Sequence, residues 1–233
     1  MRFDRLSTPS GARQNGASTS LGARARLNAL VIPGVPVDMR IHSRVLAEPL
    51  AARRQGIMLH YDDSASDDWA LEWFQDPRCK NGYTWLVLDD GKLVELADPA
   101  LRTPHAGACL VPRANSAFYG ISAATNGLVP ATVAQVEKII MACVALFRFH
   151  RWHAAEVADR IVGHDAQAVW TPEYTRAARI PESRARFLWG TVGRKVDPTG
   201  VREDGRKIID VRKVQVEVAF RLGDVAGVTY AAA

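Results

Sequence analysis

The sequence predicts an α/β fold, in which a single domain with a central mixed β-sheet flanked by helices follows a flexible N-terminal tail. Three observations support this. Short apolar runs typical of buried strands alternate with stretches whose apolar residues recur at helical spacing. One helical stretch carries clear start signals. The chain of 233 residues is 48% hydrophobic and 24% charged, which suits one sizeable domain and a tail.

The N-terminal part divides into two segments. Residues 1–26 are rich in Ser, Gly, Ala and Arg and have few large apolar groups, so they cannot bury enough surface to offset their ordering entropy. We expect a flexible basic tail there. Residues 27–55 contain three prolines and predict an extended wrap, with a short helix near Val45–Arg53. Residues 56–233 then form the main domain with a C-terminal extension.

The first half of the domain predicts strands around one helix. Gly56–His60 is a short apolar run typical of a buried strand, and Asp67–Gln75 has aromatic residues at helical spacing. Thr84–Leu88 and Lys92–Leu96 predict a hairpin around Asp89-Asp90-Gly91. Phe118–Ala124 is a third strand candidate.

The second half predicts the longest helix, over Thr132–Phe149. It has one apolar stripe that includes Cys143, and Thr132 and Gln135 have the spacing of a capping box. A shorter helix over His153–Arg160 and a last short strand at Ile161-Val162 follow. Residues 171–193 predict a long loop.

Composition excludes several classes of protein. No apolar run reaches 18 residues, which excludes a membrane span, and the basic N-terminus lacks the apolar core of a signal peptide. Most of the net charge of +5 lies in the tail, so no basic face for nucleic acid is indicated. Three cysteines without a C-x-x-C pair favour a reducing compartment. Cys109 as a nucleophile is disfavoured, because the sequence assigns it no base.

Three side chains that end strands or follow them could form a metal site. His60 ends one apolar run, His164 follows another, and Asp197 lies in a turn before Pro198. Two imidazoles and one carboxylate can hold Zn²⁺ and leave a fourth position for water. Taken singly, each residue has a structural alternative, since a histidine beside a strand and an aspartate before proline are both common.

Six segments, in this order, resemble the zinc-dependent N-acetylmuramoyl-L-alanine amidases, which include phage lysozyme-type amidases and peptidoglycan recognition proteins. The resemblance runs from about Gly56 to Pro198. The six segments are Ile57-Met58-Leu59-His60-Tyr61, Gly82–Gly91, Pro104-His105-Ala106-Gly107, Asn115-Ser116 with Gly120-Ile121, Ile161-Val162-Gly163-His164-Asp165 and Gly193–Pro198.

The resemblance implies a role for each matching position. His60, His164 and Asp197 would be the Zn²⁺ ligands. Lys195 would stabilise the oxyanion that develops at the scissile carbonyl, and Tyr83 would be a second catalytic residue beside the activated water. His105 would line the groove and contact substrate.

The sequence also departs from the family pattern. Pro104 replaces a tryptophan, and the strand after Gly120-Ile121 has Ser122-Ala123-Ala124 where other members place a glutamate. The missing carboxylate puts more weight on Tyr83. The long stretch between His164 and Lys195 contains aromatic residues that either cover the groove or only pack: Trp170, Tyr174 and Trp189. His150 and His153 form an H-x-x-H pair, which we interpret as surface residues.

The expected function is zinc-dependent hydrolysis of the amide between N-acetylmuramic acid and L-alanine in bacterial peptidoglycan. The basic tail favours a phage or prophage endolysin, cytoplasmic until it is released to the cell wall. We expect no nucleic-acid partner and assume a monomer. Three alternatives stay open: a non-catalytic peptidoglycan-binding protein, a cytoplasmic muropeptide-recycling amidase, and a zinc hydrolase for another amide.

Deleting residues 1–26 should leave folding and zinc content unchanged, because the segment has little apolar surface to bury. Binding to anionic cell walls at low salt should weaken modestly, since only screened charge would be lost. Circular dichroism, metal analysis and a wall-pelleting assay measure the three effects. Loss of folded protein on deletion would show that the segment is structural.

Overall fold

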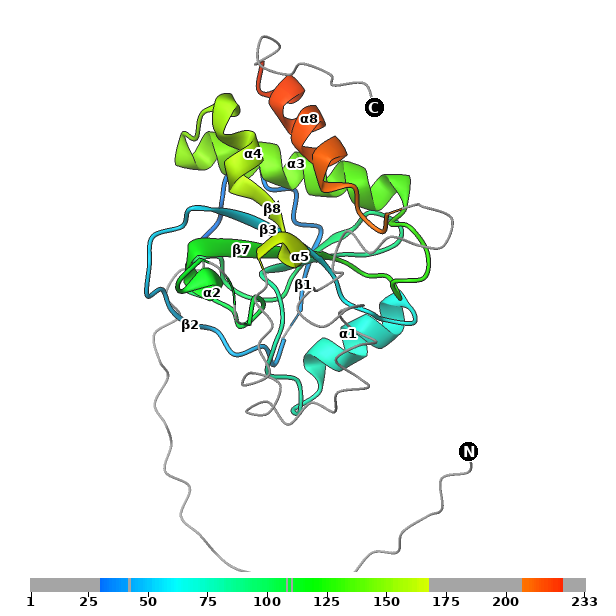
Figure 1. Ribbon diagram of the computed structural model, residues 1–233. Helices are drawn as coiled ribbons and strands as arrows, with labels where there is room; N and C mark the ends of the chain where they lie inside the picture. The colour runs from blue at the N-terminus through cyan, green and yellow to red at the C-terminus, as the bar shows by residue number, and fades with distance from the viewer. Residues whose placement is uncertain (1–29, 42, 108, 110, 168–206, 224–233) are drawn as a thin grey trace, which may run out of the picture.

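The computed structural model describes residues 30–41, 43–107, 109, 111–167 and 207–223. A six-stranded sheet in the order β1-β5-β4-β7-β3-β8 forms the centre (Figure 1). The pair β4–β5 is antiparallel and the other neighbours are parallel, which confirms the predicted mixed sheet. The strands are β1 (Met39–Arg40), β3 (Gly56–Tyr61), β4 (Trp85–Val87), β5 (Leu93–Glu95), β7 (Phe118–Ala123) and β8 (Ile161–Gly163).

Helices cover both faces of the sheet. Figure 1 shows α3 (Val133–His150) and α8 (Val211–Arg221) on one side, and α1 (Asp67–Gln75) and α2 (Ala114–Ala117) on the other. The largest core cluster joins α3 and α8 to the sheet, and two smaller clusters lie under α1 and α2. The remaining short elements are β2 (Glu48–Pro49), β6 (Leu101–Arg102), the 3-10 helix η1 (Ala154–Glu156), α4 (Val157–Arg160) and α5 (His164–Gln167).

Helix α3 is tied to the sheet at its first turn. Thr132 caps it in the predicted capping box, in which Thr132 Oγ1 accepts from the Gln135 amide and Gln135 Oε1 accepts from the Thr132 amide. The buried Gln135 Nε2 also donates to the carbonyls of Val87 and Ala124, at 3.1 and 2.9 Å. One polar side chain therefore fixes the helix start against the ends of β4 and β7.

The register of the sheet decides which side chains share a face. His60 pairs with Ser122, and Ser122 pairs with Leu86. Side chains of paired residues point to one face, and neighbours along a strand alternate. His60 therefore faces away from α3, whereas Leu59 belongs to the core beneath that helix.

Most predicted elements are confirmed within a residue or two. The predicted helix near Val45–Arg53 is wrong, because that segment is extended: the Leu46 amide donates to the Lys80 carbonyl, and Pro49 pairs with Leu101 between β2 and β6. The prediction did not include α8, and the loop predicted over 171–193 lies outside the described residues. Within the part that the structure describes, no helix is long and apolar enough to cross a membrane.

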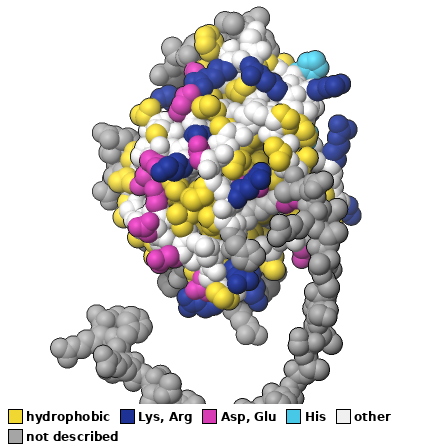
Figure 2. Space-filling model, turned by 180° about the vertical axis from the view of Figure 1, so that it is seen from behind, with side chains coloured by type: hydrophobic (Ala, Val, Ile, Leu, Met, Phe, Trp, Pro, Cys, Tyr) yellow, Lys and Arg dark blue, Asp and Glu magenta, His cyan; other side chains and the backbone are white. Residues whose placement is uncertain are grey.

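The surface opposite the view of Figure 1 mixes side chains of both signs. Figure 2 shows Lys and Arg interspersed with Asp, Glu and apolar side chains on this face. Several charged side chains of the described residues are paired, for example Lys138 with Asp38 and Arg221 with Glu137. Pairing of this kind reduces the field that the face projects into solvent.

Replacing Gln135 with alanine should lower the free energy of unfolding by about 2–4 kcal/mol, because one buried side chain makes three hydrogen bonds across two elements. The matched control is Val133→Ala, in the same helical turn but 88% exposed, which should change stability by less than about 0.5 kcal/mol. Urea titration of both variants measures the difference. Equal, small effects would show that Gln135 does not hold the helix start.

Candidate functional site

The sheet brings His60 and His164 together. Leu59 of β3 pairs with Gly163 of β8 in parallel register, so the two histidines, each the next residue along its chain, lie side by side. Their Nδ1 atoms are 3.0 Å apart and both side chains are buried. His164 is the first residue of α5, directly after β8 (Figure 1). The two predicted histidine ligands thus meet at the carboxyl end of the sheet.

Hydrogen bonds on the far side of each ring decide which nitrogen carries the proton. His164 Nε2 lies 2.7 Å from the Ala106 carbonyl, which can only accept, so Nε2 carries a proton and Nδ1 is the nitrogen that faces His60. His105 Nε2 likewise donates to the Phe118 carbonyl, at 3.3 Å. These two carbonyls fix the tautomers of His164 and His105.

His105 connects to His60 in turn. His105 Nδ1 lies 3.0 Å from His60 Nε2. Burial, reinforced by the neighbouring His60 and His164, holds the pKa of His105 well below its usual range, so the ring is neutral. A neutral ring that donates through Nε2 must accept through Nδ1. His60 Nε2 is therefore the donor of this bond, and Nδ1 is the nitrogen of His60 that faces His164.

The Nδ1 atoms of His60 and His164 therefore face each other, and in the neutral form of both rings each can act as a metal ligand. With Zn–N bonds of ~2.0–2.1 Å, two nitrogens of a tetrahedral site lie about 3.3 Å apart. The observed 3.0 Å differs from this by a few tenths of an ångström. The donor set and its spacing therefore fit a zinc ion.

The rest of the predicted ligand set falls elsewhere in the chain. Lys195 and Asp197 lie outside the described residues, as do Trp170, Tyr174 and Trp189. Among the residues that the structure does describe, no group of three or more His, Cys, Asp or Glu side chains could hold a metal ion. Within the described part of the chain, the sheet thus brings together two imidazole nitrogens.

Tyr83 lies where the sequence places a catalytic tyrosine. Its ring centroid is 4.8 Å from that of His60, and its hydroxyl donates to the Tyr61 carbonyl at 3.4 Å. Phe74 of α1 packs edge-on against it at 6.0 Å. The phenol is thus held beside one of the two facing imidazoles.

Comparison with known proteins assigns the family. A family profile described as N-acetylmuramoyl-L-alanine amidase matches residues 51–198, which include both facing histidines. The chain belongs to this family. A comparison with curated proteins gives no match.

Solved structures give a weaker likeness to this amidase. The Staphylococcus aureus hydrolase AmiA, in complex with its ligand, is 14% identical, with a TM-score of 0.51 over 81% of this chain and 87% of that one. AmpD is 17% identical, with a TM-score of 0.45 over 60% and 88% of the two chains. AmiD from E. coli, in a substrate complex, is 16% identical, with a TM-score of 0.42 over 76% and 92%. At 14% identity, the likeness to AmiA supports the fold alone.

Two polar side chains, the buried Arg54 and the half-buried Asn115, hold His105 and the segments around it in place. The guanidinium of Arg54 donates to the carbonyls of Ser116, Phe118, Pro99 and Leu101. Asn115 Oδ1 accepts from the amides of His105 and Ala106, at 3.0 and 2.7 Å. Asn115 lies in a segment that carries the family resemblance, but no sequence signal marks Arg54 as buried.

The half-buried carboxyl of Asp62 fixes the loop that follows His60. Asp62 Oδ1 accepts from the Ser64 amide and hydroxyl and from the Thr125 amide, which joins the end of β3 to the end of β7. Burial raises the pKa of Asp62 to about 6, although the hydrogen bonds act in the opposite direction.

The H-x-x-H pair of the amidase has a different role from the predicted one. His150 is half-buried rather than at the surface: its Nε2 lies 2.9 Å from the Tyr119 hydroxyl and its ring stacks on Trp152. His153 is exposed, as predicted, and its amide donates to Glu156. Cys143 is fully buried in the core, as predicted, and Cys109 donates to the Ala106 carbonyl.

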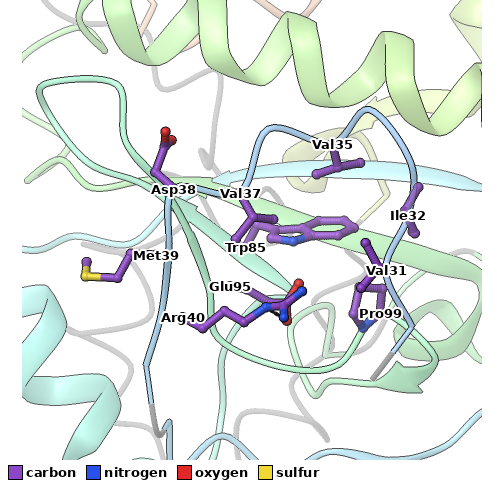
Figure 3. A pocket seen from close by; sticks show the side chains of 10 residues that line it. All are labelled: Val31, Ile32, Val35, Val37, Asp38, Met39, Arg40, Trp85, Glu95 and Pro99. Atoms are coloured by element: carbon purple, nitrogen blue, oxygen red, sulfur yellow. Dashed lines mark ion pairs between the residues drawn. The ribbon is translucent and has the colours of Figure 1, made fainter. Parts of the chain in front are cut away.

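A cavity of about 540 Å³ lies on the opposite face of the sheet (Figure 3). Trp85 lines it, and Trp85 pairs through Ile121 with Leu59, so it faces away from His60. The lining residues are Val31, Ile32, Val35, Val37, Asp38, Met39, Arg40, Trp85, Glu95 and Pro99. This cavity contains none of the residues predicted to act in catalysis.

Proposed function

We propose that the chain is a zinc-dependent hydrolase of the amide between N-acetylmuramic acid and L-alanine in peptidoglycan. The observation that carries the proposal is the pair of imidazole Nδ1 atoms, 3.0 Å apart, inside the segment that matches the amidase family.

His60 and His164 would hold zinc through their Nδ1 atoms, with Asp197 as the third ligand. Zinc in a site of two nitrogens and one carboxylate activates water at neutral pH and polarises a carbonyl oxygen. The carboxylate would offset one of the two positive charges. The fixed imidazoles would need little rearrangement to bind, because their hydrogen bonds already set both rings.

The remaining residues would act on the substrate. Lys195 would place a positive charge where the scissile carbonyl becomes an oxyanion. Tyr83, beside His60, would orient the attacking water or donate to the tetrahedral intermediate. Ser122 is the register partner of His60 and lies in the strand in which related amidases place a glutamate. Because a hydroxyl replaces that carboxylate, we assign more of this role to Tyr83.

The deciding experiment is mass spectrometry of the products from purified peptidoglycan. Release of stem peptides that begin with L-alanine supports the proposal, and binding without release would show a peptidoglycan-binding protein. We further propose an endolysin role, on the basis of the basic tail. Digestion of intact sacculi is then expected, whereas activity confined to soluble anhydro-muropeptides would show a recycling amidase.

The metal proposal predicts one zinc ion per chain. His164→Ala and Asp197→Ala should each lose zinc and activity together, because each removes a ligand. His153→Ala, which changes an exposed histidine outside the site, should keep both. Elemental analysis of the three variants gives the test. Full zinc occupancy in His164→Ala would rule out the ligand set.

The catalytic proposal predicts a separation of binding from turnover. Lys195→Ala should keep zinc and substrate affinity but lower turnover by ~10²–10³, because the ammonium acts on charge that develops only in the transition state. Tyr83→Phe should lower turnover less, since a water can replace the phenol. Zinc content, muropeptide affinity and kcat are measured side by side. Wild-type turnover in Lys195→Ala would mean that the lysine has no catalytic role.

A further inference from the structure

We infer that His105 is a positioning residue, whose ring accepts the Nε2–H of His60 and so keeps the His60 Nδ1 lone pair directed at His164. The inference rests on the proposed zinc site and deepens it, because it names the group that holds one ligand in its binding tautomer. Sequence resemblance instead predicts that His105 contacts substrate. That role needs an accessible ring, and His105 is only 8% exposed.

The contacts of His105 form one directed chain. The Phe118 carbonyl accepts from His105 Nε2, and His105 Nδ1 accepts from His60 Nε2 at 3.0 Å. The rings of His105 and His60 are perpendicular, with centroids 5.1 Å apart, so an edge of one meets an edge of the other. Each ring uses one nitrogen as donor and the other as acceptor, and the chain ends at His60 Nδ1.

The first groups in this series of hydrogen bonds, the Phe118 carbonyl and His105, are held rigidly. The Phe118 carbonyl also accepts from the Arg54 guanidinium, and both hydrogen bonds fit on the two lone pairs of one oxygen. Asn115 Oδ1 fixes the His105 backbone amide at 3.0 Å. Neither end of the His105 side chain can turn without breaking a buried hydrogen bond.

The strand beside His105 leaves room for the ring. A Cβ atom at Gly120 would lie 2.8 Å from His105 Cγ and 3.1 Å from its Nδ1. Any side chain at this position would therefore clash with the His105 ring in its present place. The glycine of β7 lets the imidazole lie flat against the strand, which is how it reaches a neighbour on β3.

The consequence for metal binding follows from tautomer chemistry. Without an acceptor at Nε2, the His60 proton can move to Nδ1, where it would block the metal-binding lone pair. Losing the second hydrogen bond of a histidine ligand typically weakens metal affinity about 10- to 100-fold. A residue that only contacts substrate would leave zinc affinity unchanged.

Two substitutions of similar shape separate these roles. In His105→Asn, the amide oxygen takes the place of ring Nδ1 and can accept from His60, whereas His105→Leu has the same branching and no acceptor. The zinc dissociation constant, measured by competition with a chromophoric chelator, should rise about 10- to 100-fold in His105→Leu and by much less in His105→Asn. His150→Leu removes a half-buried, hydrogen-bonded histidine elsewhere and should leave the constant unchanged.

A measurement on the wild-type chain completes the test, even if His105→Leu fails to fold. Nitrogen-15 spectra of the zinc-free protein should show His60 protonated at Nε2 alone, and protonation at Nδ1 overturns the inference. Equal zinc affinity in His105→Leu and wild type, or equal loss in the Leu and Asn variants, overturns it too. A raised KM with unchanged zinc affinity would establish the substrate contact instead. If the wild type binds no zinc, the proposed function fails, while the His60 tautomer still decides the role of His105.

Discussion

The facing nitrogens of His60 and His164 are the constraint on which the site depends. Parallel pairing of β3 and β8 places the two side chains next to each other, and backbone carbonyls and His105 then dictate which nitrogens face. Their Nδ1 atoms lie 3.0 Å apart and both rings are buried. The fold therefore brings together two imidazole nitrogens, which are ligands of the type that zinc sites use.

Much of the surrounding fold serves to keep these rings in place. The core under α3 holds Leu59, so His60 cannot rotate to the other face without a register shift of β3. On the site's own face, Asn115 and Arg54 hold the segment that supplies the Ala106 carbonyl and His105. The half-buried Asp62 fixes the loop after β3. Strands set the position of each imidazole, and loops anchored by buried polar groups set its orientation.

The sequence predicts the positions of the site histidines far better than the orientations of their rings. A histidine at the end of an apolar run is visible as a pattern, so His60 and His164 could be found and the mixed sheet followed from the alternation of elements. The tautomers could not be predicted, because they depend on carbonyls of residues 106 and 118 that carry no side-chain signal. Helix α8 was missed because its exposed face is charged and only a few positions, such as Val214 and Val218, are buried against α3. Strands of two residues, such as β1, are too short to show the alternation of apolar and polar residues that indicates a strand.

Arg54 shows how a charge remote from the reaction can stabilise the arrangement. Its side chain is 5% exposed, lies 4.1 Å over the Tyr119 ring and donates to several carbonyls; burial lowers its pKa to about 10, which still leaves it charged at neutral pH. Burial is the largest cause of the lowered pKa of His105, followed by the neighbouring histidines, and Arg54 adds to the same effect. A fixed cation that shares the Phe118 carbonyl thus opposes protonation of His105 Nδ1. Because that nitrogen must accept for His60 Nε2 to donate, the Arg54 charge and the tautomer of His60 are coupled through one imidazole.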